Sequence, residues 1–484
     1  IFTLCDWVEA GGRCMFFATL DPTVVFRSIA SKLGIVDGGV GYTSVVGLKI
    51  QDNFMVGAAG FEYAWEEPSA SVLDVRLDAA CTVHVASNGA NAVPMLWERN
   101  YGKGRFVVNN HGMCEKVTRG LTAAAYSLLQ DVFAYPVINS SVFFLDDFPS
   151  PVPMGNGEYI RKYFGRDISS FYSNIWWPDM LKIAEKHGVR YTGVVIEDYS
   201  ERTSGTFPRT TDTERFRYFG GLLLEKGGEI GIHGYNHMPL CPDGFDFLGK
   251  VDYETWPTAN DMRSAIAELM DFTKTLFPKN TISTYVPPSN ILSAEGRAML
   301  AESFPEIRTL SGVFLKEDYE YEQEFCVSDD GIVELPRIIS GAILDPYMRW
   351  AAFNELNFQY VNSHFIHPDD VLDEDRGAAL GWNTLRDNLD GYMDWLYGAA
   401  PGLRNQTAAE ASRAVQRYDC LTVDRTLENG VYRLNLQGFA DEAYLLLRLD
   451  GRCQKITGGS LEQVNGSLYV LRATAPEVTV VLAS

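Results

Sequence analysis

Ser-Ser-Val-Phe-Phe-Leu-Asp-Asp-Phe-Pro, at residues 140–149 of this 484-residue chain, is the stretch of sequence that decides the fold. The apolar run Val142–Leu145 predicts a buried β-strand, and Asp146 and Asp147 follow where that strand leaves the core. Two adjacent carboxylates repel each other unless a cation or a shared proton relieves them. Acids are also common in solvated turns. The pair therefore indicates either an ordinary turn or a site for a cation.

The pattern of an apolar strand followed by polar residues and then a helix recurs between residues 140 and 402. Further strands are expected at Tyr191–Ile196, Glu229–Ile232, Ile282–Val286, Ile332–Leu335 and Phe358–Val361. Helices are expected at Trp177–His187, Thr213–Lys226, Asn260–Phe277 and Ser293–Ser303. This alternation predicts parallel strands with crossover helices, hence an α/β fold with a distorted (β/α) barrel core. Barrels of this type place their chemistry at the carboxyl ends of the strands.

The flanking regions have different patterns. Residues 1–139 alternate helices with short apolar strands, end in an expected helix at Thr118–Phe133, and resemble in outline a flavodoxin-like or amidotransferase-like α/β accessory module whose first strands are missing. Residues 403–484 carry short alternating strands separated by Asn-Gly and Asp-Gly turns, which predict a small β-sandwich. Its expected strands include Tyr432–Leu436, Tyr444–Leu449 and Val478–Leu482. We therefore expect three domains.

The charge and composition of the chain limit the classes of partner that it can bind. The chain has 41 basic and 63 acidic residues, a formal net charge of -22, which disfavours nucleic acid and anionic membranes as partners. It contains no run of about 18 apolar residues that would span a bilayer. Because it starts at Ile1 without an initiator Met or a signal peptide, we expect a targeting signal upstream and an extracellular or cell-surface protein.

The eight cysteines of the chain form no Cys-x-x-Cys motif. Cys420 and Cys453 either form a disulfide or are free thiols.

Four of the seven histidines fall in two tight pairs. In His233-Gly-Tyr-Asn-His237, a spacing of four on a helical turn would put both imidazoles on one face, the arrangement that a divalent metal needs from two nitrogen ligands. An ordinary polar turn fits this pair equally well. The second pair, His364-Phe-Ile-His367, follows another expected strand.

Taken in order, these motifs resemble those of the NodB-like polysaccharide deacetylase family, over residues 140–383. Phe144-Leu-Asp-Asp-Phe148 resembles the family's Thr-Phe-Asp-Asp-Gly, which implies that Asp146 is the general base and Asp147 a metal ligand. His233 and His237 match the spacing of the His-Ser/Thr-x-x-His motif, which implies that they are the other two ligands. Gly234 replaces the hydroxyl residue of that motif, with some loss of support for the ligands.

The third motif departs from the family. Val286-Pro-Pro-Ser289 resembles Arg-Pro-Pro-Tyr, but the arginine that holds the catalytic aspartate in the family is absent, as is the tyrosine. Arg337, on the next expected strand, is a candidate to replace it. The backbone N–H of Ser289 remains available for an oxyanion, since Pro288 has none to give.

The last motif offers two candidates for the catalytic acid. We favour His367, because the Pro-Asp-Asp that follows it resembles the His-Pro-x-Glu ending of some relatives; His364 is the alternative, or else binds substrate or orients Asp146. Tyr235 is a candidate for contacting substrate. Other aromatic residues near the motifs are candidates to line a sugar groove, although most are expected in the core: Trp176, Trp177, Trp256, Tyr285, Trp350 and Trp382.

The resemblance implies metal-dependent de-N-acetylation of a polysaccharide that contains N-acetylhexosamine, such as an exopolysaccharide or a cell-wall glycan. Zn²⁺ is the first expectation for the metal, with Co²⁺, Ni²⁺ or Mn²⁺ as alternatives. The domain order together with Asp-Asp-Phe-Pro also resembles the deacetylase portion of Pel-type exopolysaccharide proteins. Because the motif arginine is missing, a catalytically inactive carbohydrate-binding or scaffold protein on the same fold is the alternative. A two-metal phosphoesterase would require more carboxylate ligands.

Overall fold

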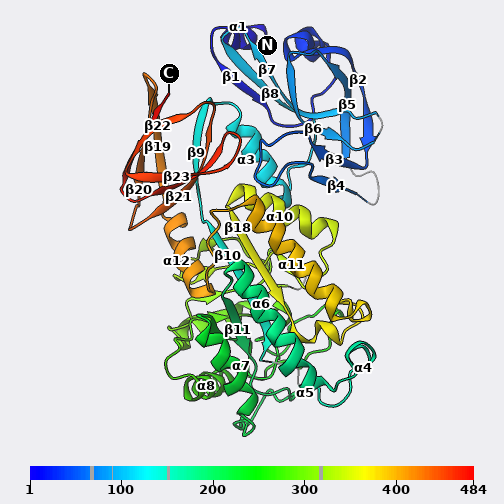
Figure 1. Cartoon of the computed structure of the whole chain (residues 1–484), viewed down its shortest axis with the longest axis vertical. Helices are drawn as coiled ribbons and strands as arrows, with labels where there is room; N and C mark the ends of the chain where they lie inside the picture. The colour runs from blue at the N-terminus through cyan, green and yellow to red at the C-terminus, as the bar shows by residue number, and fades with distance from the viewer. Residues whose placement is uncertain (66–69, 90, 150–152, 316–319, 484) are drawn as a thin grey trace.

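A computed structural model describes residues 1–65, 70–89, 91–149, 153–315 and 320–483. Figure 1 shows a β-rich N-terminal part at the top, a C-terminal pair of small sheets beside it, and a large α/β part below both. The α/β part contains the segments on which the sequence motifs lie.

A nine-stranded sheet forms the core of the α/β part. Its order is β15 (Cys326–Val327), β16 (Val333–Glu334), β14 (Thr309–Leu310), β13 (Thr284–Tyr285), β12 (Glu229–Ile232), β11 (Tyr191–Val195), β10 (Ser140–Phe148), β18 (Val361–Ile366) and β17 (Ile339–Ser340). Every neighbouring pair is parallel except β15 with β16. The sheet curls into a half-barrel, which confirms the expected α/β core.

Strand β10 is an interior strand of this sheet, paired with β11 on one side and with β18 on the other. Its run Val142–Leu145 is fully buried, because the two parallel neighbours and the helices leave neither face open to water. Burying each such side chain stabilises the fold by roughly 1.5–3 kcal/mol. The strand's carboxyl end therefore holds Asp146 and Asp147 on a rigid support.

The helices of the α/β part mostly match the expectations. They are α4 (Glu158–Phe164), α5 (Ile168–Phe171), α6 (Trp177–His187), α7 (Glu214–Glu225), α8 (Ala259–Leu276), α9 (Ala294–Ser303), α10 (Pro346–Phe358), α11 (Trp382–Ala399) and α12 (Ala408–Asp419). Helix α6 ends at Gly188, whose φ of 69° stops it in the left-handed region. The expected strand Phe358–Val361 is wrong: α10 continues to Phe358, and β18 begins only at Val361.

The C-terminal part is a β-sandwich, as expected. One sheet has the order β19 (Thr422–Glu428), β20 (Val431–Gln437), β25 (Glu477–Leu482) and β22 (Cys453–Thr457). The other has the order β23 (Gly459–Asn465), β24 (Leu468–Ala473), β21 (Ala443–Leu449) and β9 (Val132–Val137). Strand β9 lies before residue 139, so the first expected domain boundary does not match the packing. Helix α12, beyond the second boundary, packs against β10, β14 and β16.

The N-terminal part differs from a flavodoxin-like or amidotransferase-like module. Its main sheet has the order β1 (Arg13–Phe16), β8 (Gly104–Asn109), β7 (Pro94–Tyr101), β6 (Cys81–Ser87), β3 (Gly47–Ile50) and β4 (Glu62–Ala64), and only β1 with β8 is parallel. Short hairpin connections between β6, β7 and β8 impose the antiparallel pairing. The remaining elements are α1 (Phe2–Glu9), α2 (Val24–Ile29), the pair β2 (Ile35–Val45) and β5 (Ala70–Leu77), and α3 (Arg119–Ser127), which ends six residues before the expected Phe133.

The structure also bears on the cysteines and on membrane-spanning helices. All eight cysteines are unpaired, so Cys420 and Cys453 form no disulfide. Among the helices that the structure describes, none combines the length and the apolar character that crossing a membrane requires.

The N-terminal part is docked on α10. Asn357 accepts a hydrogen bond from the Val56 N–H at 2.7 Å and donates one to the Val56 carbonyl at 3.0 Å. Asn354 accepts from the N–H of Leu121 at 2.9 Å. Tyr63 stacks on Trp350 with ring centroids 4.9 Å apart. These contacts hold the helix whose first turn borders the pocket described below.

Replacing Asn357 by Ala tests this docking. Asn357→Ala leaves a buried N–H and a buried carbonyl of Val56 without partners, so we expect a loss of about 3 kcal/mol in the free energy of unfolding. Guanidinium titration followed by tryptophan fluorescence measures it. The control is Asn388→Ala, at an exposed position on α11, which should stay within about 0.5 kcal/mol of wild type. Equal midpoints for the two variants would contradict this role of Asn357.

Candidate active site

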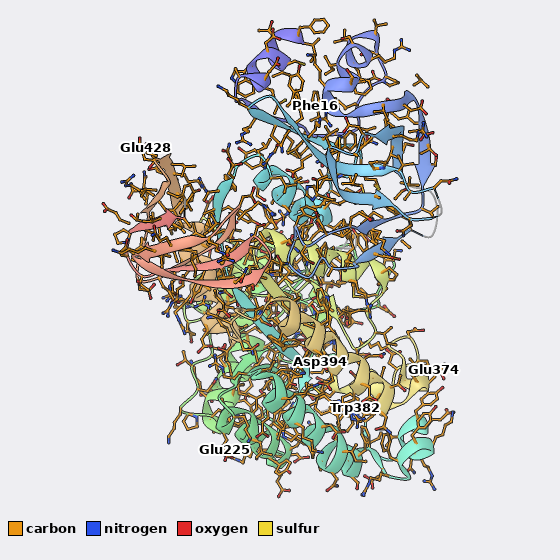
Figure 2. All side chains as sticks on the ribbon, turned by 45° about the horizontal axis from the view of Figure 1, so that its top comes forward. Phe16, Glu225, Glu374, Trp382, Asp394 and Glu428 are labelled. Carbon is orange, nitrogen blue, oxygen red and sulfur yellow. The ribbon has the colours of Figure 1, made fainter. Side chains whose placement is uncertain are left out.

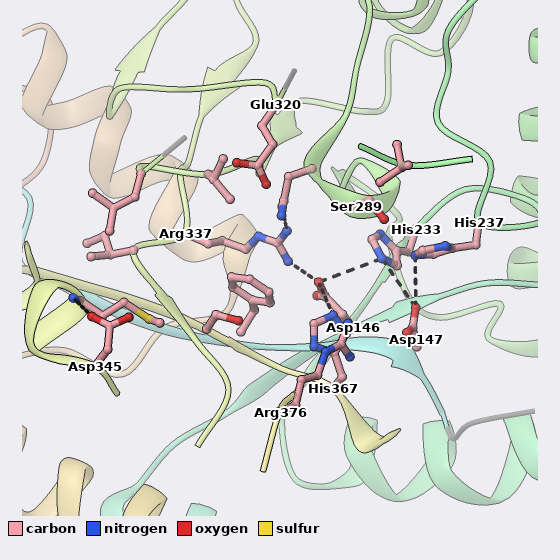
Figure 3. Close-up of a pocket in the computed structure, with 18 of the residues that line it drawn as sticks. Asp146, Asp147, His233, His237, Ser289, Glu320, Arg337, Asp345, His367 and Arg376 are labelled. Atoms are coloured by element: carbon pink, nitrogen blue, oxygen red, sulfur yellow. Dashed lines mark hydrogen bonds and ion pairs between the residues drawn. The ribbon is translucent and has the colours of Figure 1, made fainter. Parts of the chain in front are cut away.

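Most of the side chains predicted from the motifs meet in one pocket, as Figure 3 shows. The pocket has a volume of about 550 Å³ and opens at the carboxyl ends of β10, β12, β13 and β18. Its lining includes Asp146, Asp147, His233, His237, Ser289, Arg337 and His367. Parallel strands bring their carboxyl ends to one edge of a sheet, so residues as far apart in the chain as Asp146 and His367 become neighbours.

A bulge at the end of β10 separates the two aspartates. The register between β10 and β11 shifts between Leu145 and Phe148, and Asp147 has a φ of 50°, in the left-handed region. Such a bulge re-aims the side chains of the bulged strand. Asp146 consequently stays 1% exposed inside the barrel, while Asp147 turns toward the two histidines.

The histidine pair lies on an irregular turn and not on the helical turn that we expected. Gly234 has a φ of 81° and His237 a φ of 60°, so this segment is not helical. A Cβ on Gly234 would lie 2.8 Å from Cγ of Pro288, which explains why no hydroxyl residue occupies this position. The turn still brings the imidazoles together, with ring centroids 5.1 Å apart.

Asp147, His233 and His237 form a group that fits a divalent metal. The Asp147 Oδ1 atom lies 3.6 Å from His233 Nε2 and 3.7 Å from His237 Nε2, and it is buried without a hydrogen-bond partner. His233 donates from Nδ1 to the Val286 carbonyl at 2.8 Å, which leaves the lone pair on Nε2 facing Asp147. Burial lowers the pKa of both histidines to about 4, so both are neutral near pH 7, as metal ligands must be.

Arg337 lies where the missing motif arginine would be needed. Its Nη1 donates to Asp146 Oδ2, its Nη2 donates to Asn290 Oδ1, and its guanidinium stacks over the ring of Phe365 at 4.1 Å. Burial raises the pKa of Asp146, but the charges of Arg337, His233 and His367 outweigh it and hold the pKa below its usual range. Asp146 is therefore a carboxylate near neutral pH, positioned to accept a proton.

His367 is the histidine of the second pair that reaches the pocket. Its Nε2 lies 3.9 Å from Asp146 Oδ2, and its Nδ1 lies 3.5 Å from Asp370 Oδ1. Burial lowers the pKa of His367, but its contacts with Asp370 outweigh that effect and raise it above the usual value. A histidine that stays protonated near neutral pH is suited to donate a proton.

His364 and Tyr235 lie outside this group, which corrects two of the expectations. Side chains along a strand alternate between faces, so His364, three positions before His367, points the other way. It is fully buried and donates from Nε2 to the Gly341 carbonyl at 2.6 Å. Tyr235 is 1% exposed, and its hydroxyl donates to the Pro208 carbonyl at 2.7 Å.

The other candidate aromatics are core residues as expected, each at most 3% exposed: Trp176, Trp177, Trp256, Tyr285, Trp350 and Trp382.

Tyr253 is a site residue that the motifs do not reveal. It lies on the segment between β12 and α8, and its hydroxyl lies 3.4 Å from His237 Nδ1 and also hydrogen-bonds Ser289 Oγ. By contacting Nδ1, the hydroxyl orients the His237 ring so that Nε2 faces Asp147. A tyrosine 16 positions after a motif gives no signal in the sequence, because the segment between them has no periodic pattern.

A second group of potential ligands lies between α6 and α11, formed by His187, Asp390 and Asp394. Lys186 Nζ lies 2.9 Å from carboxylate oxygens of both aspartates. Because this ammonium already pairs with both carboxylates, we assign no metal there.

Comparison with known proteins gives a family and a fold. Residues 68–470 match the family described as "uncharacterised protein conserved in bacteria (DUF2194)". The chain belongs to this family. No curated protein matches the sequence.

Several solved structures are similar. The crystal structure of Agd3, described as a novel carbohydrate deacetylase, aligns with a TM-score of 0.58 over 100% of this chain and 87% of that chain, at 11% identity. A putative polysaccharide deacetylase from Mycobacterium smegmatis aligns with a TM-score of 0.35 over 58% of this chain and 91% of that chain, at 14% identity. A mutant of a CE4 family pseudoenzyme with restored enzymatic activity aligns with a TM-score of 0.32 over 57% and 69%, at 12% identity. The likeness to Agd3 shows that this chain shares the fold of that protein, which agrees with the expected NodB-like core.

The contact of Tyr253 with His237 predicts an effect on metal affinity. Partners that orient a metal-binding histidine typically contribute 10- to 100-fold to affinity, so Tyr253→Phe should weaken the binding of a divalent metal about tenfold. Competition with a chromophoric chelator measures this. Tyr218→Phe, at an exposed position on α7, removes a hydroxyl from another element and should bind the metal as wild type does. Equal affinity in both variants would mean that Tyr253 does not orient His237.

Proposed function

We propose that this protein hydrolyses the N-acetyl group of an N-acetylhexosamine in a polysaccharide, as a metal-dependent hydrolase. The observation that carries the proposal is the convergence of Asp147, His233 and His237 beside the Asp146–Arg337 pair and His367. One carboxylate and two imidazoles are a ligand set of hydrolytic zinc sites, and Zn²⁺ is our first assignment, with Co²⁺, Ni²⁺ or Mn²⁺ as alternatives. Bound there, the metal supplies a Lewis acid that polarises the acetyl carbonyl and acidifies water.

Two residues beside the ligands carry out the two proton transfers of the reaction. Asp146 accepts a proton from the attacking water, and Arg337 holds that carboxylate in place. The Ser289 N–H is available to the developing oxyanion, since Pro288 before it has no N–H. His367 donates a proton to the leaving nitrogen. The C–N bond of the amide breaks, a C–O bond to the water oxygen forms, and acetate and a free amine leave.

The proposal includes the type of polymer and the location of the protein. A chain of net charge -22 attracts a polymer that gains amines as it is deacetylated. Substrates of this class, exopolysaccharides and cell-wall glycans, lie outside the cell, so we place the protein there. The resemblance to Pel-type proteins supports an exopolysaccharide.

The alternative is an inactive carbohydrate-binding or scaffold protein on the same fold. It was suggested by the missing arginine of the third motif. The contact of Arg337 with Asp146 supplies the charge that Val286 lacks, which favours an active site.

Metal content and acetate release together test the proposal. We expect about one zinc per chain and release of acetate from N-acetylglucosamine oligomers or poly-N-acetylglucosamine. Asp147→Ala and His233→Ala should lose both, whereas Asp146→Asn should keep the metal and lose at least about 100-fold in rate. Asp375→Asn, an exposed control, should match wild type. A folded protein that binds zinc and releases no acetate from either substrate would favour the scaffold alternative.

The pH dependence tests the role of His367. A proton donor whose pKa is raised stays active to higher pH, and activity falls as pH rises through that pKa. Asp370→Asn removes the contact that raises the pKa, so the alkaline limb of kcat/KM should move to lower pH. The limb should not move in Asp375→Asn. An alkaline limb unchanged by Asp370→Asn would mean that His367 is not the donor.

A further inference from the structure

A second cavity borders the active-site pocket. It has a volume of about 330 Å³ and lies between the N-terminal part and the first turn of α10. Tyr347, 45% exposed at the start of α10, lines both this cavity and the active-site pocket, so the two are neighbours across one side chain. The Tyr347 side chain therefore stands between the two cavities, and a polymer bound in the active-site pocket would pass this ring to reach the N-terminal part.

Aromatic rings form the walls of this cavity. Tyr63 stacks flat on Trp350, with an interplanar angle of 3°, and Trp65 lies beside Tyr63 with ring centroids 5.3 Å apart. Trp65 and Tyr347 are partly exposed, whereas Tyr63 and Trp350 are buried behind them. The faces of such rings carry negative charge and attract cations.

Carboxylates complete the arrangement. Glu115 lines the cavity and is exposed, and Asp345 lies two residues before Tyr347 on the side of the active-site pocket. Burial raises the pKa of the Tyr347 hydroxyl, and the charges of Glu115 and Asp345 raise it further. Asp345 is already engaged in capping α10, through the Met348 N–H at 2.8 Å. Glu115 is therefore the acid best placed to pair with a bound cation.

We propose that this cavity binds a hexosamine unit whose amine is already free, in the same polymer whose acetylated unit lies at the metal ligands. Aromatic faces combined with a carboxylate recognise an ammonium group, and a hexosamine without its acetyl group carries one near neutral pH. The inference rests on the proposed function for the identity of the polymer. Its consequence is that the protein prefers partly deacetylated polymer, so that each reaction creates a unit that the neighbouring cavity retains.

Binding of two defined oligomers tests the proposal without relying on hydrolysis. Isothermal titration of the zinc-loaded chain compares the glucosamine tetramer with the N-acetylglucosamine tetramer. We expect the glucosamine tetramer to bind about tenfold more tightly in low salt, and the preference to shrink as salt is added. Glu115→Gln and Trp65→Ala should each remove most of the preference.

A charge-matched control separates the cavity from the general field of an acidic protein. Glu225→Gln makes the same change in net charge on the last turn of α7; Glu225 lies far from the labelled Phe16 of the N-terminal part in Figure 2. This variant should keep the full preference. Equal binding of both tetramers by wild type, or a preference that Glu115→Gln and Glu225→Gln change alike, would overturn the proposal. His233→Ala should retain the preference, because the cavity does not include the metal-binding group. Selective binding by the wild-type protein without acetate release from any substrate would uphold this cavity and reject the proposed hydrolysis.

Discussion

The ion pair between Asp146 and Arg337 is the interaction on which the rest of the site depends. Both side chains are at most 2% exposed, and a charge buried so deeply is tolerated only with a partner of opposite charge. Arg337 in turn hydrogen-bonds Asn290, next to Ser289, so one guanidinium ties the end of β10 to the third motif. The pair compensates for the burial of a carboxylate at the end of an interior strand and keeps it charged, which is the state that a general base requires.

Buried hydrogen bonds also fix the position of the N-terminal part. Buried asparagines on α10 hold this part against the helix, and the first turn of the helix borders the active-site pocket. The N-terminal part therefore lines the cavity next to the active-site pocket, whereas the pocket itself is lined by residues of the α/β part. Its antiparallel sheet carries Tyr63 next to Trp350, so the docking contact and the aromatic cavity share the same residues.

Local patterns predict much of this structure, and long-range contacts account for most of what they miss. Strand β12 and helix α6 have the expected bounds, because their apolar residues recur at the right spacing and Gly188 ends the helix. Strand β9 was missed, because it pairs with β21, more than 300 residues later in the chain. The Pro-Asp-Asp that follows His367 favoured it over His364 in the sequence, and the structure agrees, since His367 lines the pocket and His364 is fully buried outside it. The position of Tyr253 could not be predicted, because it lies on a segment without any periodic pattern.

Anomalous diffraction from crystals of the zinc-loaded protein, recorded on both sides of the zinc absorption edge, tests the central claim most directly. The account predicts one strong peak within bonding distance of Asp147 Oδ1 and the Nε2 atoms of His233 and His237. A peak only at His187, Asp390 and Asp394, or no peak at either group in protein soaked with zinc, would contradict it.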